Sequence, residues 1–246
     1  MRQFGLIGYP LSHSFSKKYF AEKFEREGLN NCIYENYPIP SINELTALLK
    51  DYPSLEGLNV TIPYKEKVIP FLSARSAVVE KINACNCIKI ENGQLSGHNT
   101  DVTGFELSLV PKLKKHHRKA LILGTGGAAK AVEYVLSKLG IQSQYVSRVA
   151  SPGILGYESV SRDLLSEYTL IVNTTPLGMY PETGTCPPIP YDAISNRHYL
   201  FDLVYNPAKT VFLQNGARFG AVISNGGSML QIQAEESWKI WNPSTV

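Results

Sequence analysis

The sequence predicts an α/β protein built from two alternating series of strands and helices. Short apolar runs alternate with segments of helical periodicity over residues 3–62, and a second such series covers residues 119–241. A glycine-rich turn at residues 124–127 follows the first strand of the second series. Alternation of this kind is typical of a parallel or mixed sheet covered by helices. The length of 246 residues suits two modest domains or one elongated body.

The first series is expected to contain strands at 3–8, 33–39 and 57–62, with helices at 16–28 and 42–52. Alternation in the third strand sends Asn59 and Thr61 to one face and places Val60 and Ile62 on the core side. Residues 87–98 are expected to form a hairpin, because Asn92-Gly93 is favoured in two-residue type I′ turns. A helix over 101–113 leads out of this region.

The second series has apolar segments, expected to be strands, at 119–124, 142–147, 169–176, 199–205 and 221–226. Helices are expected at 128–140 and 228–241. We place the domain boundary near 101–118 and expect the C-terminal helix to return to the first domain. The domains are then 1–101 plus 227–246, and 102–226.

Composition argues against several classes of protein. The net charge of +3 is too small to indicate a nucleic-acid partner, and the basic run at Lys112–Lys119 is more typical of a solvated helix end. No window approaches a membrane span, and the N-terminus has no signal-peptide pattern. Cys85 and Cys87 lie two residues apart, which is not a zinc pattern, so no metal is expected and a reduced cytoplasmic protein is the simplest interpretation.

The segment 120–132 carries a G-x-G-x-x-[G/A] motif between a strand and a helix. Gly124 permits the tight turn, Gly126 lets the backbone approach a pyrophosphate, and Ala129 keeps the helix close to its strand. The helix N-terminus adds an anion-binding site. A glycine-rich turn can also serve only as a connection, but in this context the motif favours dinucleotide binding.

The strand at 142–147 indicates which dinucleotide is bound. An NAD site usually has an acidic residue at the end of this strand, whereas here Ser147 is followed by Arg148. A guanidinium favours a 2′-phosphate, so NADP is the predicted cofactor.

Other polar groups follow successive apolar runs, where a doubly wound sheet binds its ligands. In the second series these are "VNTTPLGM", "FDLVYNP" and "ISNGGSM"; in the first they are "YPLSHSFS" and "HNTD". Each stretch can also be an ordinary strand-to-helix connection, and Asp101 can equally cap the following helix.

Taken in order, these motifs resemble the shikimate dehydrogenase family along nearly the whole chain. The matching stretches are "GYPLSHSFS", "GLNVTIPYKEKV", "INACNCI", "GHNTDVTGF", "GTGGAAKAV", "VNTTPLGM", "FDLVYNP" and "NGGSMLQIQA". The resemblance implies a substrate domain made of the N-terminal region and the C-terminal helix, and a Rossmann-like, doubly wound NADP domain between them. It implies reversible, NADP-dependent reduction of 3-dehydroshikimate to shikimate, a step of chorismate and aromatic amino-acid biosynthesis.

The resemblance also implies the roles of individual residues. Lys65 would be the catalytic acid and base, with Asp101 beside it. The substrate would be held by Ser12, Ser14, Asn59, Thr61, Asn86, Tyr205 and Gln233. The cofactor would be held by Gly124, Thr125, Gly126, Gly127, Ala128, Ser147, Arg148, Thr174, Leu203 and Gly226.

Two departures from the family pattern bear on these expectations. Val149 stands where a threonine commonly assists phosphate binding, so NAD use is possible. Asn83 replaces a glycine and is one of the few residues that tolerate its positive φ. The alternatives are a quinate/shikimate dehydrogenase that uses NAD, and a catalytically silent ligand-binding homologue. The small-molecule substrate is the expected partner, and either a monomer or a homodimer is compatible with the sequence.

Overall fold

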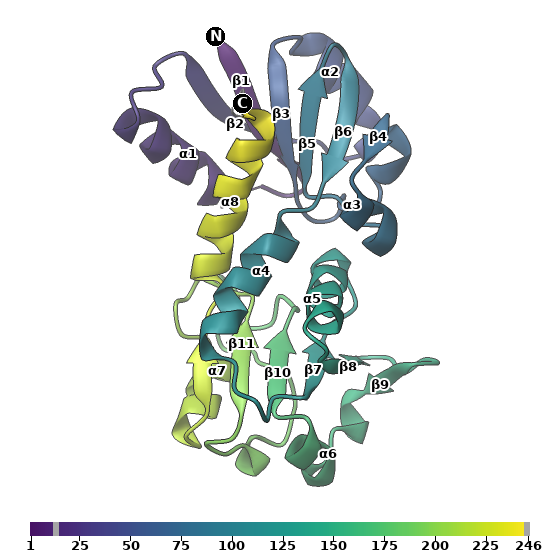
Figure 1. Cartoon of the computed structure of the whole chain (residues 1–246), viewed down its shortest axis with the longest axis vertical. Helices are drawn as coiled ribbons and strands as arrows, with labels where there is room; N and C mark the ends of the chain where they lie inside the picture. The colour runs from purple at the N-terminus through teal and green to yellow at the C-terminus, as the bar shows by residue number, and fades with distance from the viewer. Residues whose placement is uncertain (12–14, 244–246) are drawn as a thin grey trace. The chain divides into compact units, whose positions relative to one another are not determined.

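The computed structural model describes residues 1–11 and 15–243, which divide into two compact units. Unit 1 contains Met1–Thr100 and Gln233–Val246, and unit 2 contains Asp101–Ile232 (Figure 1). Unit 1 is therefore discontinuous in sequence, with unit 2 inserted before the C-terminal segment.

Unit 1 is built on a six-stranded mixed sheet. Its strands are β1 (Arg2–Gly8), β2 (Cys32–Pro38), β3 (Leu55–Val60), β4 (Ala74–Arg75), β5 (Cys87–Glu91) and β6 (Gln94–His98), in the order β2-β1-β3-β5-β6-β4. β1 is parallel to β2 and β3, whereas β5 is antiparallel to both β3 and β6. The predicted hairpin of β5 and β6 is confirmed, because Asn92 and Gly93 both have positive φ as a type I′ turn requires.

One expectation about β3 is wrong. The strand ends at Val60, and the backbone N–H of Tyr64 donates to the carbonyl oxygen of Thr61 to form a turn. Strand alternation therefore stops before Ile62, whose side chain is 68% exposed and does not enter the core. Val60 is buried as expected.

The helices of unit 1 are α1 (Phe15–Arg26), the 3₁₀ turn η1 (Ile42–Glu44) leading into α2 (Leu45–Asp51), the 3₁₀ turn η2 (Ile69–Phe71) and α3 (Ala77–Ile82). The short helix α3 is absent from the sequence prediction. Ser76 caps it by accepting from the backbone N–H of Val79, and it ends at Asn83, whose φ is 51°. The predicted positive φ of Asn83 is confirmed.

Unit 2 is built on a six-stranded sheet of parallel pairs. Its strands are β7 (Lys119–Leu123), β8 (Gln142–Ser147), β9 (Ile154–Gly156), β10 (Leu170–Asn173), β11 (Tyr199–Asp202) and β12 (Val222–Ser224). Their order, β12-β11-β10-β7-β8-β9, is that of the doubly wound dinucleotide-binding fold. The predicted fold class is confirmed.

The helices of unit 2 are α4 (Asp101–Leu109), α5 (Gly127–Lys138), α6 (Arg162–Glu167) and α7 (Val211–Arg218), with 3₁₀ turns η3 (Val110–Lys112), η4 (Tyr157–Ser159) and η5 (Tyr191–Ala193). The helix predicted over 101–113 is shorter than expected, because Pro111 cannot continue the α-helical hydrogen bonds and the chain passes into η3. The sequence prediction also omits α6 and α7.

Helix α8 (Gly227–Trp241) begins in unit 2 and brings its C-terminal turns back to unit 1, as predicted. The ring of Trp241 stacks on that of Phe4 in β1, with centroids 5.0 Å apart, and its indole Nε1 donates to the carbonyl oxygen of Ile88 at 2.9 Å. Figure 1 shows the last turns of α8, in yellow, alongside this sheet.

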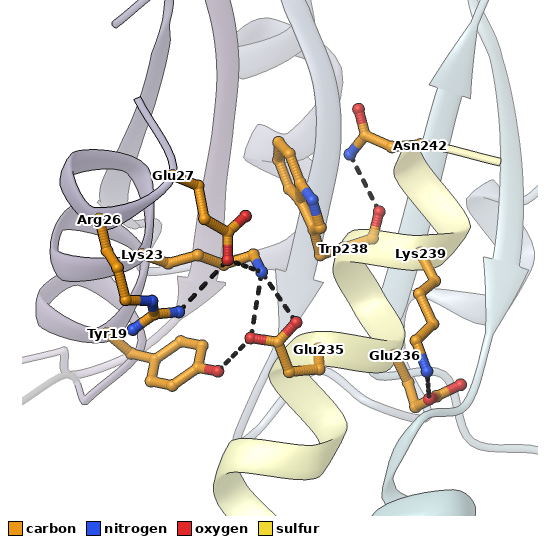
Figure 2. A network of polar contacts seen from close by, with 9 residues as sticks. All are labelled: Tyr19, Lys23, Arg26, Glu27, Glu235, Glu236, Trp238, Lys239 and Asn242. Carbon is orange, nitrogen blue, oxygen red and sulfur yellow. Dashed lines mark hydrogen bonds and ion pairs between the residues drawn. The ribbon is translucent and has the colours of Figure 1, made fainter. Parts of the chain in front are cut away.

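Opposite charges on α1 and α8 add to this packing (Figure 2). The ammonium of Lys23 lies 2.8 Å from a carboxylate oxygen of Glu27 and 2.8 Å from one of Glu235, and the hydroxyl of Tyr19 donates to Glu235. The Lys23 side chain is only 5% exposed, so its charge is neutralised inside the protein.

The basic run at Lys112–Lys119 contacts residues 197, 223 and 224 of unit 2. Lys112 donates to Ile223 and Ser224, and ring nitrogens of His116 and His117 contact the carbonyl oxygen of Arg197. Within residues 1–11 and 15–243, no helix combines the length and hydrophobicity needed to cross a bilayer.

Candidate active site

The glycine-rich turn lies at the carboxyl end of β7, where the strand order reverses between β7 and β10. Gly124 has a φ of 108°, and a Cβ there would lie 2.6 Å from the hydroxyl oxygen of Thr174, so the position requires glycine. Gly126 precedes α5, and open space surrounds the place where its Cβ would be.

The first turn of α5 presents backbone N–H groups without a side-chain cap at Gly126. Such groups, together with the helix dipole, favour an anionic ligand. Gly127 and Ala128 are partly exposed on this turn, whereas Ala129 is fully buried. The partly exposed turn from Gly126 to Ala128 fits the pyrophosphate of a dinucleotide. Ala129 faces the interior, as its place in the motif predicts.

The neighbouring strand β8 ends at Ser147, and Arg148 follows it as an exposed residue. Val149 is 76% exposed, so its isopropyl group fills no core position. The end of β8 thus presents one guanidinium and no carboxylate in Ser147–Val149, a donor set that fits a phosphate.

The other predicted cofactor residues follow β10, β11 and β12 at the same edge of the sheet. Thr174 follows β10, and its hydroxyl donates to the carbonyl oxygen of Leu123 at 2.7 Å. Leu203 follows β11, and its backbone N–H donates to the carbonyl oxygen of Asn173. Gly226 follows β12, where a Cβ would overlap the carbonyl oxygen of Leu203. Parallel strands therefore bring all these predicted residues to one edge.

Asp202, at the end of β11, fixes the loops at this edge. It accepts hydrogen bonds from the side chain of Asn173, the N–H of Val204 and the hydroxyl of Thr210, which caps α7. Burial raises the pKa of this carboxyl to about 6, although these three hydrogen bonds act to lower it. The sequence motif "FDLVYNP" marks Asp202, whose role in the structure is to hold the ends of β10 and β11.

In unit 1, the predicted substrate residues gather at one end of the mixed sheet. Asn59 lies near the end of β3, Thr61 follows that strand, and Asn86 immediately precedes β5. The backbone N–H of Val60 donates to the carbonyl oxygen of Asn86 at 2.8 Å, which joins the two segments. Gln233 reaches unit 1 from α8, with the hydroxyl of Thr100 3.5 Å from its side-chain oxygen.

Lys65 lies in the loop after β3 and is half-buried. Its carbonyl oxygen accepts a hydrogen bond of 2.7 Å from the backbone N–H of Cys85, next to Asn86 in the chain. Asp101 is 6% exposed and is the first residue of α4, directly after Thr100. The loop contact fixes the backbone from which the Lys65 side chain extends.

Of the remaining predicted substrate residues, one belongs to unit 2 and two lie outside the described residues. Tyr205 follows β11 and belongs to unit 2, where burial raises the pKa of its hydroxyl. Ser12 and Ser14 lie outside the residues that the structure describes.

Three polar residues that contact Asn59 or Asn86 were not predicted from the sequence. Tyr34, Thr100 and Ser237 are all at most 4% exposed and hydrogen-bond to predicted substrate residues. Ser237 follows Gln233 by four residues, so helical spacing could have placed it on the same face of α8. Tyr34 carries no comparable signal, since its partner lies 25 residues away.

Within 1–11 and 15–243, no three His, Cys, Asp or Glu residues are grouped so that they could hold a metal ion. The predicted substrate and catalytic residues carry amides, hydroxyls, one ammonium and one carboxylate, groups that can donate to or accept from a polyhydroxylated ligand.

Residues 6–88 match the family model of the shikimate dehydrogenase substrate binding domain. The chain is 34% identical to a shikimate dehydrogenase (NADP(+)) from Caldanaerobacter subterraneus, over 97% of this chain and 90% of the relative. It is 36% identical to one from Carboxydothermus hydrogenoformans, over 96% of this chain and 90% of the relative.

Similarity extends to solved structures. The shikimate 5-dehydrogenase from Thermus thermophilus, determined in complex with NADP(H) and shikimate, matches with a TM-score of 0.86 and 29% identity, over 98% of this chain and 94% of that one. Sequence and fold therefore agree along almost the whole length of the protein. This chain belongs to the shikimate dehydrogenase family.

Proposed function

We propose that this protein catalyses the reversible, NADP-dependent reduction of 3-dehydroshikimate to shikimate. The observation that carries the proposal is the similarity to NADP-dependent shikimate dehydrogenases over 97% of the chain. We assign substrate binding to residues 1–101 and 227–246 and dinucleotide binding to 102–226. The substrate-domain match over residues 6–88 supports this division.

Reduction of a ring ketone needs a hydride at carbon and a proton at oxygen, and the bound nicotinamide supplies only the hydride. Lys65 donates the proton to the carbonyl oxygen during reduction and accepts it again in the reverse direction. We assign to Asp101 the position beside the Lys65 ammonium, where its carboxylate contacts a substrate hydroxyl. The fixed backbone of Lys65, held through Cys85, supports this role.

The remaining polar residues hold the substrate. Thr61, Asn86 and Gln233 bind ring hydroxyls, because amides and hydroxyls can match their donors and acceptors. Ser12 and Ser14 bind the carboxylate of the substrate, and Tyr205 contacts the ring. The side chain of Asn59 is 4% exposed and hydrogen-bonded within the protein.

NADP is held along the carboxyl edge of the unit 2 sheet. Gly124, Thr125, Gly126, Gly127 and Ala128 form the pyrophosphate turn, Ser147 and Arg148 receive the 2′-phosphate, and Thr174, Leu203 and Gly226 line the remaining length. The absence of a side-chain cap on α5 and the open space at Gly126 support this assignment. The exposed Val149 lacks a hydroxyl for the phosphate, which favours some activity with NAD.

Nicotinamide absorbance measured with purified protein, shikimate and NADP tests the proposal. The same assay with NAD and with quinate decides between a strict shikimate dehydrogenase and a quinate/shikimate enzyme that uses NAD. Turnover of shikimate with NADP is expected to be the fastest combination. Failure to turn over shikimate with either dinucleotide, in a sample with folded circular dichroism, would leave only the catalytically silent homologue.

We further propose that the protein acts in the cytoplasm as a monomer or a homodimer. All four cysteines are free thiols, and Cys32, Cys85 and Cys87 are buried, which suits a reducing compartment.

A further inference from the structure

A buried polar network lies among the proposed substrate residues of unit 1. It joins side chains from β2, β3, the loops before β5 and α4, and helix α8. Each member is at most 8% exposed. We call it the Asn59 network, and its members are Tyr34, Asn59, Asn86, Thr100, Gln233 and Ser237.

The amide of Asn59 is used up inside this network. Its Nδ2 donates to the carbonyl oxygen of Asn86 at 3.2 Å and to the hydroxyl of Ser237 at 2.8 Å, while its Oδ1 accepts from the hydroxyl of Tyr34 at 2.9 Å. A carbonyl oxygen can only accept, so the orientation of the amide is fixed. Both N–H groups are engaged, and Asn59 has no donor left for a ligand.

The amide of Asn86 is oriented by Thr100. The backbone N–H of Thr100 donates to Oδ1 of Asn86 at 2.7 Å, and Nδ2 of Asn86 donates to the Thr100 hydroxyl at 3.0 Å. Because a backbone N–H can only donate, this orientation is also fixed. The second amide N–H of Asn86 has no partner among residues 1–11 and 15–243, so Asn86 can offer a substrate oxygen a donor.

Ser237 ties helix α8 to both asparagines. Its hydroxyl accepts from Asn59, donates to the carbonyl oxygen of Gln233 at 2.9 Å and lies 3.3 Å from the Thr100 hydroxyl. Gln233 is one turn earlier on the same helix. The rotamer of Asn86 and the position of Gln233 are therefore set by a single connected network.

We propose that Thr100 and Ser237 are positioning residues for substrate binding, and that Asn59 links them from inside the protein without touching the substrate. This inference rests on the proposed function. Connected hydrogen bonds inside a protein hold side chains in one geometry, and binding of a polyhydroxylated ring depends on such geometry. Loss of a network hydroxyl leaves a buried donor unpaired and weakens the contacts that hold the neighbouring side chains in place.

The first test is Thr100→Val, which removes the hydroxyl and keeps the shape of the side chain. We expect its KM for shikimate to rise about 5- to 20-fold, the effect of one lost hydrogen bond. Its KM for NADP should stay unchanged, and Thr100→Ser should restore the KM for shikimate. A general loss of stability would not produce this split. Equal shikimate KM values in Thr100→Val and the wild type would overturn the role of Thr100.

Ser237→Ala tests the other positioning residue and carries the proposal if Thr100→Val does not fold. Its matched control is Glu235→Gln on the same helix, which contacts α1 and no member of the Asn59 network. We expect the shikimate KM to rise about 5- to 20-fold in Ser237→Ala and to stay at the wild-type value in the control. A rise of the same size in both variants would show a nonspecific effect of α8 and overturn the inference.

A double-mutant cycle tests the internal role of Asn59. If Asn59 acts through Ser237, then Asn59→Ala combined with Ser237→Ala should raise the shikimate KM no further than Asn59→Ala alone. Multiplying effects would instead reveal a direct contact with the substrate. If the wild type turns over shikimate and all these variants have the wild-type KM, the positioning roles are overturned and the proposed function stands. If the wild type is folded but inactive, the proposed function is overturned and this inference with it.

Discussion

Lys65 is the residue on which the proposed chemistry depends most directly. It is half-buried, and its backbone is tied to the loop that carries Asn86. We predict that Lys65→Ala lowers kcat by about 10²- to 10⁴-fold, the usual contribution of a positioned acid or base, while shikimate binding is largely retained. Steady-state kinetics and calorimetric titration with shikimate measure the two effects.

The matched control is Lys67→Ala, which changes an exposed lysine two residues further on and should behave as the wild type. Near-normal turnover in Lys65→Ala would refute the assignment.

Arg148 is the residue that decides between the two dinucleotides. It supplies the only cationic side chain among Ser147–Val149, and charge-assisted bonds to phosphate are worth more than neutral ones. We predict that Arg148→Gln lowers kcat/KM for NADP roughly 10- to 100-fold and changes kcat/KM for NAD by less than about threefold. Arg162→Gln, another exposed arginine of unit 2, is the control. A parallel decrease with both cofactors would mean that Arg148 does not contact the 2′-phosphate.

At the level of secondary-structure elements, the pairing of α1 with α8 depends on the buried charge of Lys23 (Figure 2). Burial acts to raise the pKa of Glu235, but donation from Lys23 and Tyr19 outweighs it and lowers that pKa. Glu235→Gln removes the negative charge and leaves the Lys23 ammonium with Glu27 alone. We predict a loss of about 1–2 kcal/mol in the free energy of unfolding, measured by urea denaturation.

The control for this prediction is one residue away on the same helix. Glu236 pairs with Lys239, whose side chain is 68% exposed, and solvent weakens such a pair. Glu236→Gln should therefore cost no more than about 0.5 kcal/mol. Equal losses in the two variants would contradict the importance of burial at Lys23.

For the whole molecule, acid stability depends on histidines that are folded in the neutral form. The backbone N–H of Lys114 donates to Nδ1 of His117 at 3.0 Å, so this nitrogen carries no proton. Burial, with the charge of His116, lowers the pKa of His117 to about 4. Burial also lowers the pKa of His198, whose Nδ1 accepts from the N–H of Ser195.

The sign of the pH effect follows from these shifts. Between the ordinary histidine pKa of 6.5 and about 4, the unfolded chain binds protons that folded His117 rejects, so acid favours unfolding. The raised pKa of Asp202 acts in the opposite sense, because its contribution is present at low pH and is lost as pH rises through about 6.

The free energy of unfolding of the wild type is expected to fall between pH 7 and pH 4.5. We predict that in His117→Gln this fall is smaller by roughly 1–3 kcal/mol. Urea denaturation at several pH values measures the free energy of unfolding of both proteins. His116→Gln, at the exposed neighbour, should leave the slope nearly unchanged. A wild-type slope in His117→Gln would show that another group controls acid unfolding.

The sequence was most informative where a local rule has a local cause. The Asn92-Gly93 turn, the positive φ of Asn83 and the glycine turn at Gly124 each follow from the backbone freedom of one or two residues, and the structure contains all three. Alternating apolar runs likewise predicted the main strands of both sheets. Short helices such as α3 and α6 were missed because six residues offer too little periodicity to detect.

Pairings between distant residues could not be predicted in the same way. Local alternation placed Ile62 in the core, whereas the turn after Val60 exposes it. The family resemblance implied that Asn59 contacts the substrate, yet Tyr34 and Ser237, 25 and 178 residues away, form hydrogen bonds with its amide. The sequence by itself determined the fold class, the dinucleotide turn and the family, because these depend on local periodicity and on motifs in order. Only the tertiary structure decided which polar groups are left to face a ligand, because hydrogen bonds between distant segments use up donors that look free in the sequence.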